Sequence, residues 1–93
     1  MGGIESAATH VRRKKLQFRS WHRGTRELDL IFGPFADATI ETLDAAELDD
    51  YERLLNLQDN DVMDWVLGAR PLPPEVDSPL FQRILAFRQI PPS

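Results

Sequence analysis

Apolar residues that recur every three or four positions are the feature of this sequence that most constrains its fold. Leu28, Ile31, Phe32 and Phe35 follow an i, i+3, i+4, i+7 pattern. This spacing places all four side chains on one face of a helix. No segment shows the alternation of β-branched and polar residues that is typical of a half-buried strand. The sequence therefore predicts an all-α protein.

Length and composition indicate that the helices share a single core. The chain has 93 residues, of which 42% are hydrophobic, enough for one domain and too few for two. It has no cysteine, which excludes disulfides, a thiolate nucleophile and a cysteine-based zinc site. Its uncharged apolar runs fall far short of the ~20 residues that a membrane span needs. We expect a flexible tail over residues 1–11 and one helical domain over residues 12–93.

Two helices are expected in the first part of the chain, with a corner between them at Gly24. The first is predicted to start near Arg12. The second carries the apolar stripe of residues 28–35. It should kink or end near Pro34, which has no amide proton and clashes with the preceding turn. We expect a kink, with Phe35 still on the core side. The apolar residues of the first helix are Leu16, Phe18 and Trp21. From their helical spacing we expect the aromatic residues Phe18 and Trp21 to lie in the core.

A third and a fourth helix are predicted from their capping residues. Asp44 and Glu47 have the spacing of a capping box before an apolar helical pattern. A fourth helix should end at Gly68, before Pro71. The N-cap candidates of this fourth helix are Asp59, Asn60 and Asp61.

A fifth helix should follow the proline-rich stretch RPLPPEVDSP, which cannot be regular and is expected to be a stiff connection. Asp77 or Ser78 would cap the helix, with Pro79 in the first helical position. Pro91 and Pro92 would close it. The predicted architecture is a single small domain of about five short helices packed as a compact bundle.

Charge is distributed unevenly, although the formal net charge is only −4. Between Asp37 and Asp77 a dozen carboxylates accompany only two basic residues, Arg53 and Arg70. The molecule should have a positive end and a negative body, and its partner should be complementary to one of them. The early basic residues are Arg12, Arg13, Lys14, Lys15, Arg19, Arg23 and Arg26.

The sequence offers no residue set that supports catalysis or a metal site. His10 and His22 have no second ligand at helical spacing. Asp59, Asp61 and Asp64 lack the glycine and the bidentate glutamate of a calcium loop, and capping of the fourth helix explains them better. No serine lies in a nucleophile elbow and no glycine-rich phosphate loop is present. We expect neither a catalytic residue nor a metal ligand.

The corner formed by residues 23–27, Arg-Gly-Thr-Arg-Glu, admits two interpretations. In a purely structural one, Gly24 ends a helix in the left-handed conformation and Glu27 favours the positive end of the next helix dipole. The two arginines then stay unexplained. In a functional one, the missing Cβ of Gly24 lets a partner's backbone approach, while Arg23 and Glu27 flank it as donor and acceptor.

This corner and its surroundings resemble the succinate dehydrogenase assembly factor 2 family, also called the flavinators, whose bacterial members are called SdhE. The family hallmark is an Arg-Gly-x-x-Glu motif, which stands here at residues 23–27. The resemblance spans residues 12–87. The matching residues outside the motif are Phe18-Arg19-Ser20-Trp21-His22, Leu28-Asp29, Pro34-Phe35, Tyr51, Leu54-Leu55, Asp59, Asp61 and Trp65.

The resemblance implies a small all-helical assembly chaperone for respiratory complex II. Such a protein binds the flavoprotein subunit of succinate dehydrogenase, and in some bacteria that of fumarate reductase, and promotes covalent attachment of FAD to a histidine of that subunit. By position, Arg23, Gly24 and Glu27 would form the docking surface, with Arg26 and Asp29 as further candidates. The bond formation would belong to the flavin and the client. We therefore expect no stably bound cofactor in this chain.

The resemblance does not determine the oligomeric state or the compartment, and two other functions remain as alternatives. We expect a monomer when free, and a bacterial cytoplasm rather than a mitochondrial matrix because the segment before the first helix is short. One alternative is an antitoxin-like regulator, since proteins of this family have also been described as partners of a membrane-associated toxin. Another is nucleic-acid binding through the basic residues 12–26, although no recognition helix is evident. Salt dependence distinguishes nucleic-acid binding from the assembly-factor function, because DNA affinity falls steeply as counterions compete, whereas a glycine-centred protein interface should be less sensitive.

Overall fold

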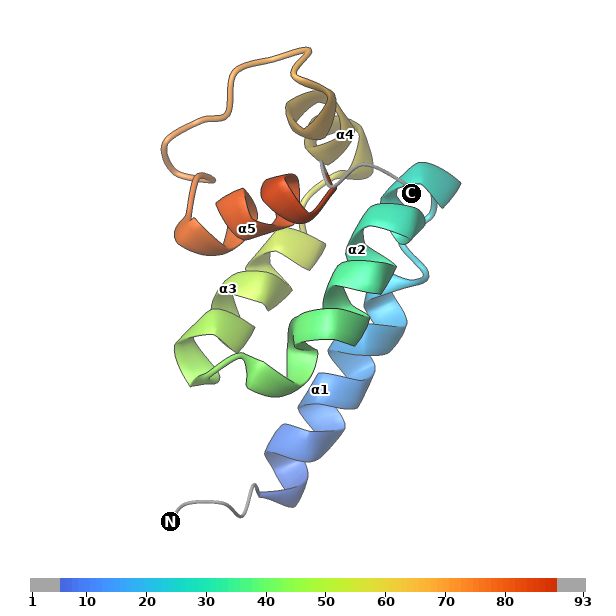
Figure 1. Cartoon of the computed structure of the whole chain (residues 1–93), viewed down its shortest axis with the longest axis vertical. Helices are drawn as coiled ribbons and strands as arrows, with labels where there is room; N and C mark the ends of the chain where they lie inside the picture. Colours follow the sequence, from blue (N-terminus) through green and yellow to red (C-terminus); the bar gives the residue numbers. More distant parts are fainter. Residues whose placement is uncertain (1–5, 89–93) are drawn as a thin grey trace.

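The computed structural model describes residues 6–88, which form five α-helices and one short 3-10 helix (Figure 1). The helices are α1 Ala7–Ser20, α2 Arg26–Thr39, η1 Ile40–Thr42, α3 Ala45–Leu55, α4 Asp59–Leu67 and α5 Pro79–Arg88. No strand occurs in this part of the chain. The prediction of an all-α domain with about five short helices is confirmed.

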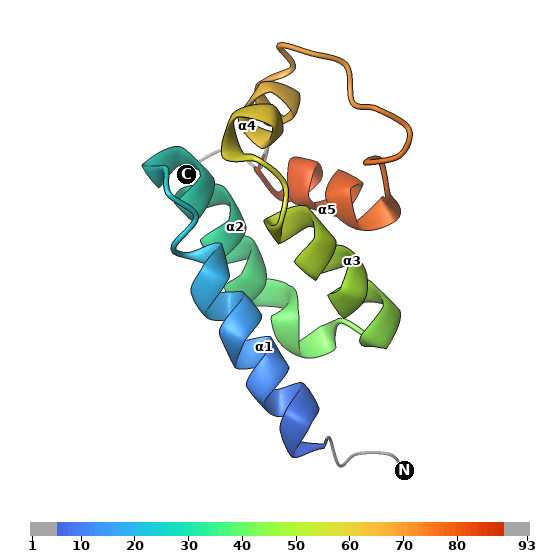
Figure 2. The same ribbon diagram turned by 180° about the vertical axis from the view of Figure 1, so that it is seen from behind.

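The first three α-helices run alternately up and down the long axis of the molecule (Figures 1 and 2). α2 packs against α1 and against α5, and α3 also contacts both α1 and α5. α4 and α5 lie towards the end of the molecule that holds the corner between α1 and α2 (Figure 1). None of the described helices is both long enough and apolar enough to cross a membrane.

The core is centred on Tyr51 of α3, which is fully buried. Its ring lies 6.3 Å from that of Phe32 and 6.0 Å from that of Phe35, measured between centroids. Leu28 completes the buried part of the predicted α2 stripe, while Ile31 is half-buried and packs against the core. The stripe therefore faces inward as its spacing predicts.

The first helix begins at Ala7 rather than near Arg12. Ser6 is its N-cap and accepts a hydrogen bond from the Thr9 amide at 3.1 Å. Alanines favour a helix directly after such a cap, so residues 7–11 are helical and the predicted tail was too long. Residues 1–5 lie outside the described part of the chain.

One member of the early basic cluster is an interior residue. Arg13 is 7% exposed, and its Nη1 donates to the carbonyls of Ile40 and, at 2.8 Å, of Leu43. These carbonyls lie in and just after η1, where a short helix leaves acceptors without intrahelical partners. Arg13 therefore fastens α1 to the turn between α2 and α3.

The second helix continues through Pro34 to Thr39 instead of ending there. The amide that proline lacks would have bonded the carbonyl of Leu30, a residue that is 55% exposed. Water can satisfy that carbonyl on the solvent side, so the helix continues. Phe35 is buried, as predicted.

Most predicted caps are confirmed. Asp44 Oδ1 accepts from the Glu47 amide at 2.8 Å, and Glu47 Oε1 accepts from the Asp44 amide at 2.9 Å, which completes a capping box. Gly68 ends α4 in the left-handed conformation with φ +75°. Ser78 Oγ accepts from an amide in the first turn of α5, and Pro79 is its first residue. The predicted closing prolines, 91 and 92, lie outside the described residues.

The predicted N-cap of α4 is wrong. The cap is Gln58, whose side chain makes no capping hydrogen bond. Asp59 and Asp61 lie in the first turn instead. Their carboxylates bind arginines, an outcome that depends on contacts distant in sequence.

Candidate protein-docking site

The Arg-Gly-x-x-Glu motif forms the corner between α1 and α2 (Figure 2). α1 ends at Ser20, and the chain turns at Gly24, whose φ of +113° is a conformation that L side chains rarely adopt. Thr25 is the N-cap of α2, with Oγ1 accepting from the Leu28 amide at 3.3 Å. Glu27 lies in the first turn, at the positive end of the helix dipole, as predicted.

Arg23 is a buried brace within the corner. Its side chain is 3% exposed. Nη1 donates to the Leu55 carbonyl at 3.1 Å, and Nη2 donates to the Leu57 carbonyl at 3.1 Å and to Asp59 Oδ1 at 2.8 Å. The guanidinium carbon lies 4.8 Å from the centroid of the Phe32 ring, within the range of a cation–π contact.

This position differs from the expectation that the Arg23 guanidinium faces a partner. α3 ends at Leu55, so its last carbonyls lack intrahelical donors. A guanidinium presents several donors in one plane and can satisfy such carbonyls together with a carboxylate. Arg23 thereby ties the corner to the junction between α3 and α4.

The space at Gly24 is restricted by a neighbouring side chain as well as by the backbone conformation. A Cβ at this position would lie 2.9 Å from Asp59 Oδ2. The space beside the glycine is thus bounded by a side chain of this chain. The missing Cβ leaves room for the Asp59 carboxylate on the inner side of the corner, independently of any partner that binds on the outer side.

Asp29, a further docking candidate from the sequence, is also used internally. It is half-buried, and its Oδ1 accepts from the backbone amide of Arg23 at 2.6 Å. The first turn of α2 therefore holds the residue that precedes the glycine.

Three of the five candidate residues are exposed: Gly24, Arg26 and Glu27. We call these three the corner face. No hydrogen bond or ion pair within residues 6–88 engages the side chain of Arg26 or Glu27, so both are available to a partner. The corner face therefore presents one cation, one anion and an open stretch of backbone.

Phe18 of α1 and His22, which follows the helix, form an exposed aromatic pair, although the spacing of Phe18 predicts a core position. Phe18 is 63% exposed, and its ring stacks on that of exposed His22 with centroids 4.0 Å apart and an interplanar angle of 13°. His22 Nδ1 lies 2.7 Å from the Phe18 carbonyl. Helical spacing shows which residues share a face, but not whether another element covers that face. The pair borders a shallow hollow whose lining residues are Lys14, Gln17, Phe18, Trp21, His22 and Asp37.

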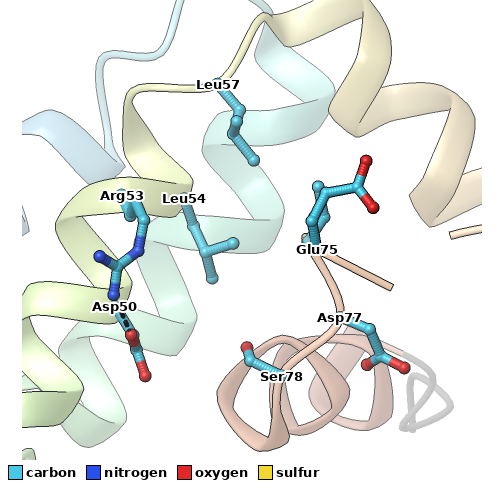
Figure 3. A pocket seen from close by; sticks show the side chains of 8 residues that line it. Asp50, Arg53, Leu54, Leu57, Glu75, Asp77 and Ser78 are labelled. Carbon is cyan, nitrogen blue, oxygen red and sulfur yellow. Dashed lines mark hydrogen bonds and ion pairs between the residues drawn. The ribbon is translucent and has the colours of Figure 1, made fainter. Parts of the chain in front are cut away.

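A second hollow, between α3 and the connection to α5, has a volume of about 310 Å³ (Figure 3). Residues 50–54 of α3 form one wall and residues 75–78 form the other (Figure 3). Asp50 pairs with Arg53, and Asp77 Oδ1 accepts from Gln82 Nε2 at 3.0 Å. The only hydroxyl in the lining, that of Ser78, caps α5. This hollow contains no motif residue and offers no activated nucleophile.

The aspartates of α4 are explained by ion pairs. Asp59 binds Arg23 at 2.8 Å, whereas Asp61 and Asp64 bind Arg70 at 2.6 and 3.0 Å. No group of three or more histidine or carboxylate side chains in the described residues could hold a metal ion.

The sequence of the corner and of the helices around it matches a known protein family. The family model described as "Flavinator of succinate dehydrogenase" matches residues 14–88, a span that contains the whole motif. The chain belongs to this flavinator family. The family predicted from residues 23–27 is thereby confirmed.

Relatives of this flavinator chain come from bacteria and from mitochondria. The FAD assembly factor SdhE of Acetobacter pasteurianus is 39% identical over 88 residues, which cover 95% of this chain and 81% of the relative. The mitochondrial succinate dehydrogenase assembly factor 2 of Dictyostelium discoideum is 36% identical over 72 residues, 77% of this chain and 51% of the relative. For the protein of that name in Mycosarcoma maydis the identity is 35% over 71 residues, 76% of this chain and 30% of the relative. This chain therefore spans only part of the mitochondrial relatives.

Proposed function

We propose that this flavinator is an assembly factor that binds the flavoprotein subunit of succinate dehydrogenase and promotes covalent attachment of FAD to it. The family membership and the names of the relatives support this function. The structural observation that carries the proposal is the corner face, which stays exposed while the Arg23 side chain behind it is buried and held by three hydrogen bonds.

The braced corner supports docking because it is preorganised. Arg23 is held by three side-chain hydrogen bonds, to the carbonyls of Leu55 and Leu57 and to Asp59, and its amide is held by Asp29. A surface that is already ordered loses little conformational entropy when a partner binds. The exposed Arg26 and Glu27 can then form charge-assisted hydrogen bonds with the client.

The role in flavin attachment is to select a client conformation. When bound to the client, FAD supplies the chemistry of the new bond, and the flavin remains on the client rather than on this chain. Binding to a conformation that keeps the client histidine close to the isoalloxazine lowers the ordering cost of the reaction. The factor acts as a chaperone and contributes no catalytic residue.

Flavinylation of a purified client tests this function. The client flavoprotein would be incubated with FAD and the factor, and its covalent flavin fluorescence measured after denaturation. Wild-type factor should accelerate attachment, and Glu27→Ala should abolish most of that acceleration. Glu41→Ala removes an exposed carboxylate from η1 and is the matched control. Equal acceleration by wild-type factor and Glu27→Ala would remove the corner face from the proposal.

We further propose a bacterial cytoplasmic monomer that also accepts the fumarate reductase flavoprotein. The similarity to bacterial SdhE supports the compartment. Affinity capture from a bacterial cytoplasm, followed by identification of bound flavoproteins, would test both clients. Static light scattering of the free factor would measure its molar mass and so test whether it is a monomer.

Nucleic-acid binding is less well supported than protein docking. Arg13 and Arg23 are buried, and Arg12 binds Asp49 and Glu52 at 2.7 and 2.9 Å. These three arginines of the basic segment are thus engaged within the molecule. Fewer cations remain to displace counterions from a phosphate backbone.

A further inference from the structure

We infer that Asp59 is a positioning residue for the docking corner, although it lies 36 positions after Arg23 in the chain. The inference rests on the proposed function, since it concerns how the corner face is held for the client. It assigns to the start of α4 a role in presenting a motif that lies between α1 and α2.

One carboxylate binds the first motif residue and lies beside the second. Asp59 Oδ1 accepts from Arg23 Nη2 at 2.8 Å. Its other oxygen, Oδ2, lies where a Cβ at position 24 would come within 2.9 Å. Asp59 therefore supports the arginine electrostatically and bounds the glycine sterically, so the position of its carboxylate sets the position of the corner.

Burial makes this contact hard to replace. The side chain of Arg23 is 3% exposed and that of Asp59 is 27% exposed, so the guanidinium has little contact with water that could replace the carboxylate. Arg23 Nε is buried and already has no hydrogen-bond partner. Without Asp59 the guanidinium would keep only two carbonyl acceptors and would carry an uncompensated charge. The expected response is a shift of Arg23 towards water, which moves the adjoining Gly24.

The start of α4 is well suited to hold the corner. Asp59 is the first residue of the helix, and the helix continues from it with the Val62 amide donating to the Gln58 carbonyl at 3.0 Å. The carbonyls of Leu55 and Leu57, just before it in the chain, bind the same guanidinium. Arg23 thus fixes the corner to the junction between α3 and α4, and Asp59 is the charged residue of that junction.

Asp61 provides a matched control because it lies in the same turn of α4. It is also a carboxylate near a helix N-terminus and also pairs with an arginine, Arg70, at 2.6 Å. Replacing either aspartate removes one charge and one ion pair, but only Asp59 touches the motif. A core variant, Ile84→Ala, supplies a second control for general destabilisation, since Ile84 is fully buried in α5.

The experiment compares Asp59→Asn, Asp59→Ala, Asp61→Asn, Asp61→Ala and Ile84→Ala in the full chain. Affinity for the purified client flavoprotein would be measured well below each melting temperature. The Gly24 amide signal would be followed by NMR. We expect Asp59→Ala to weaken client binding about tenfold or more, equivalent to about 1.4 kcal/mol, and to shift the Gly24 signal. Asp59→Asn should have a smaller effect of the same kind, because it keeps an acceptor oxygen. The controls should change affinity by less than about twofold.

The outcomes separate this inference from the proposed function. If wild-type factor binds the client and the Asp59 and Asp61 variants lose affinity equally, the positioning role is wrong while the function stands. The same holds if Ile84→Ala, at equal thermal stability, loses as much affinity as Asp59→Ala. If wild-type factor does not bind the client, the proposed function itself fails, and the Gly24 signal still reports whether Asp59 holds the corner. Should Asp59→Ala not fold, Asp59→Asn decides the outcome.

Discussion

The indole of Trp21 packs directly against the backbone of Gly33. A Cβ at position 33 would lie 2.3 Å from Trp21 Cδ2, far inside van der Waals contact. The Trp21 Nε1 proton is donated to Asp37 Oδ1 at 3.2 Å, one turn further along α2. α1 and α2 thus approach closely at a point where only glycine leaves room for the indole.

Gly33→Ala should therefore destabilise the protein, by roughly 1–3 kcal/mol as expected for an overpacked contact. In an exposed helix the same change would stabilise by about 0.5–1 kcal/mol, so the sign of the effect tests the contact. Thermal or urea unfolding monitored by circular dichroism measures it. A more stable variant with unchanged tryptophan fluorescence would show that Trp21 does not rest on Gly33.

Arg23→Lys should destabilise the fold despite keeping the charge. A lysine ammonium cannot match the planar fork that spans two carbonyls and Asp59, so buried acceptors would lose their donors. We expect a loss of about 1–3 kcal/mol in the free energy of unfolding, the range for buried acceptors that lose their donors. Arg26→Lys, at an exposed position of the same corner, is the control and should stay within about 0.5 kcal/mol of wild type. Equal stability of the two variants would contradict the structural role of the buried Arg23 guanidinium.

Tyr51 should titrate far above its ordinary range. Burial raises its pKa to about 12, an effect that the hydrogen bond with Ser20 partly opposes. Its hydroxyl oxygen lies 2.6 Å from Ser20 Oγ. Because Tyr51 is the only tyrosine of the chain, tyrosinate absorbance reports this residue alone. It should appear near pH 12 in the folded protein and near pH 10 in denaturant.

The raised pKa predicts a loss of stability at high pH. The folded state disfavours the phenolate, so the stabilising contribution is complete below the unfolded pKa of about 10 and declines as pH rises towards 12. Unfolding curves of wild-type protein and Tyr51→Phe across this window should converge as the wild type loses that contribution. Parallel curves would show that Tyr51 ionises equally in both states.

Trp65→Ala should weaken folding rather than docking. Trp65 is half-buried, packs against the core, and meets the Phe81 ring edge-on at 6.5 Å between centroids. Truncation should cost about 2–4 kcal/mol, with client affinity unchanged at temperatures where the variant is folded. Leu67→Ala, in the same helix and 60% exposed, is the control. Intact thermal stability of Trp65→Ala would contradict the packing of its side chain on the core.

Local sequence patterns predicted the helices and several of their ends correctly. The Asp44–Glu47 capping box, Gly68 and Pro79 act through residues within about four positions of themselves. Such contacts form wherever the local sequence allows them, so they can be read without knowing the fold. The family was predicted in the same way, from a short contiguous motif at residues 23–27.

The roles of the motif residues depended on the tertiary structure. The arginine, which was expected to face a client, is buried because the end of α3 brings unpaired carbonyls and Asp59 to it. Phe18, assigned to the core by its spacing, lies on a face of α1 that is left open. Both outcomes depend on which surfaces of other helices meet the residue, and no local pattern contains that information.

The all-α fold, most of the helix caps and the family motif thus follow from the sequence alone, because they depend on short-range geometry and on contiguous residues. The packing of the helices, by contrast, is what places Arg23 and Asp29 inside the corner and leaves Gly24, Arg26 and Glu27 exposed. The reason is physical: burial of a charge is stable only where distant segments supply its partners.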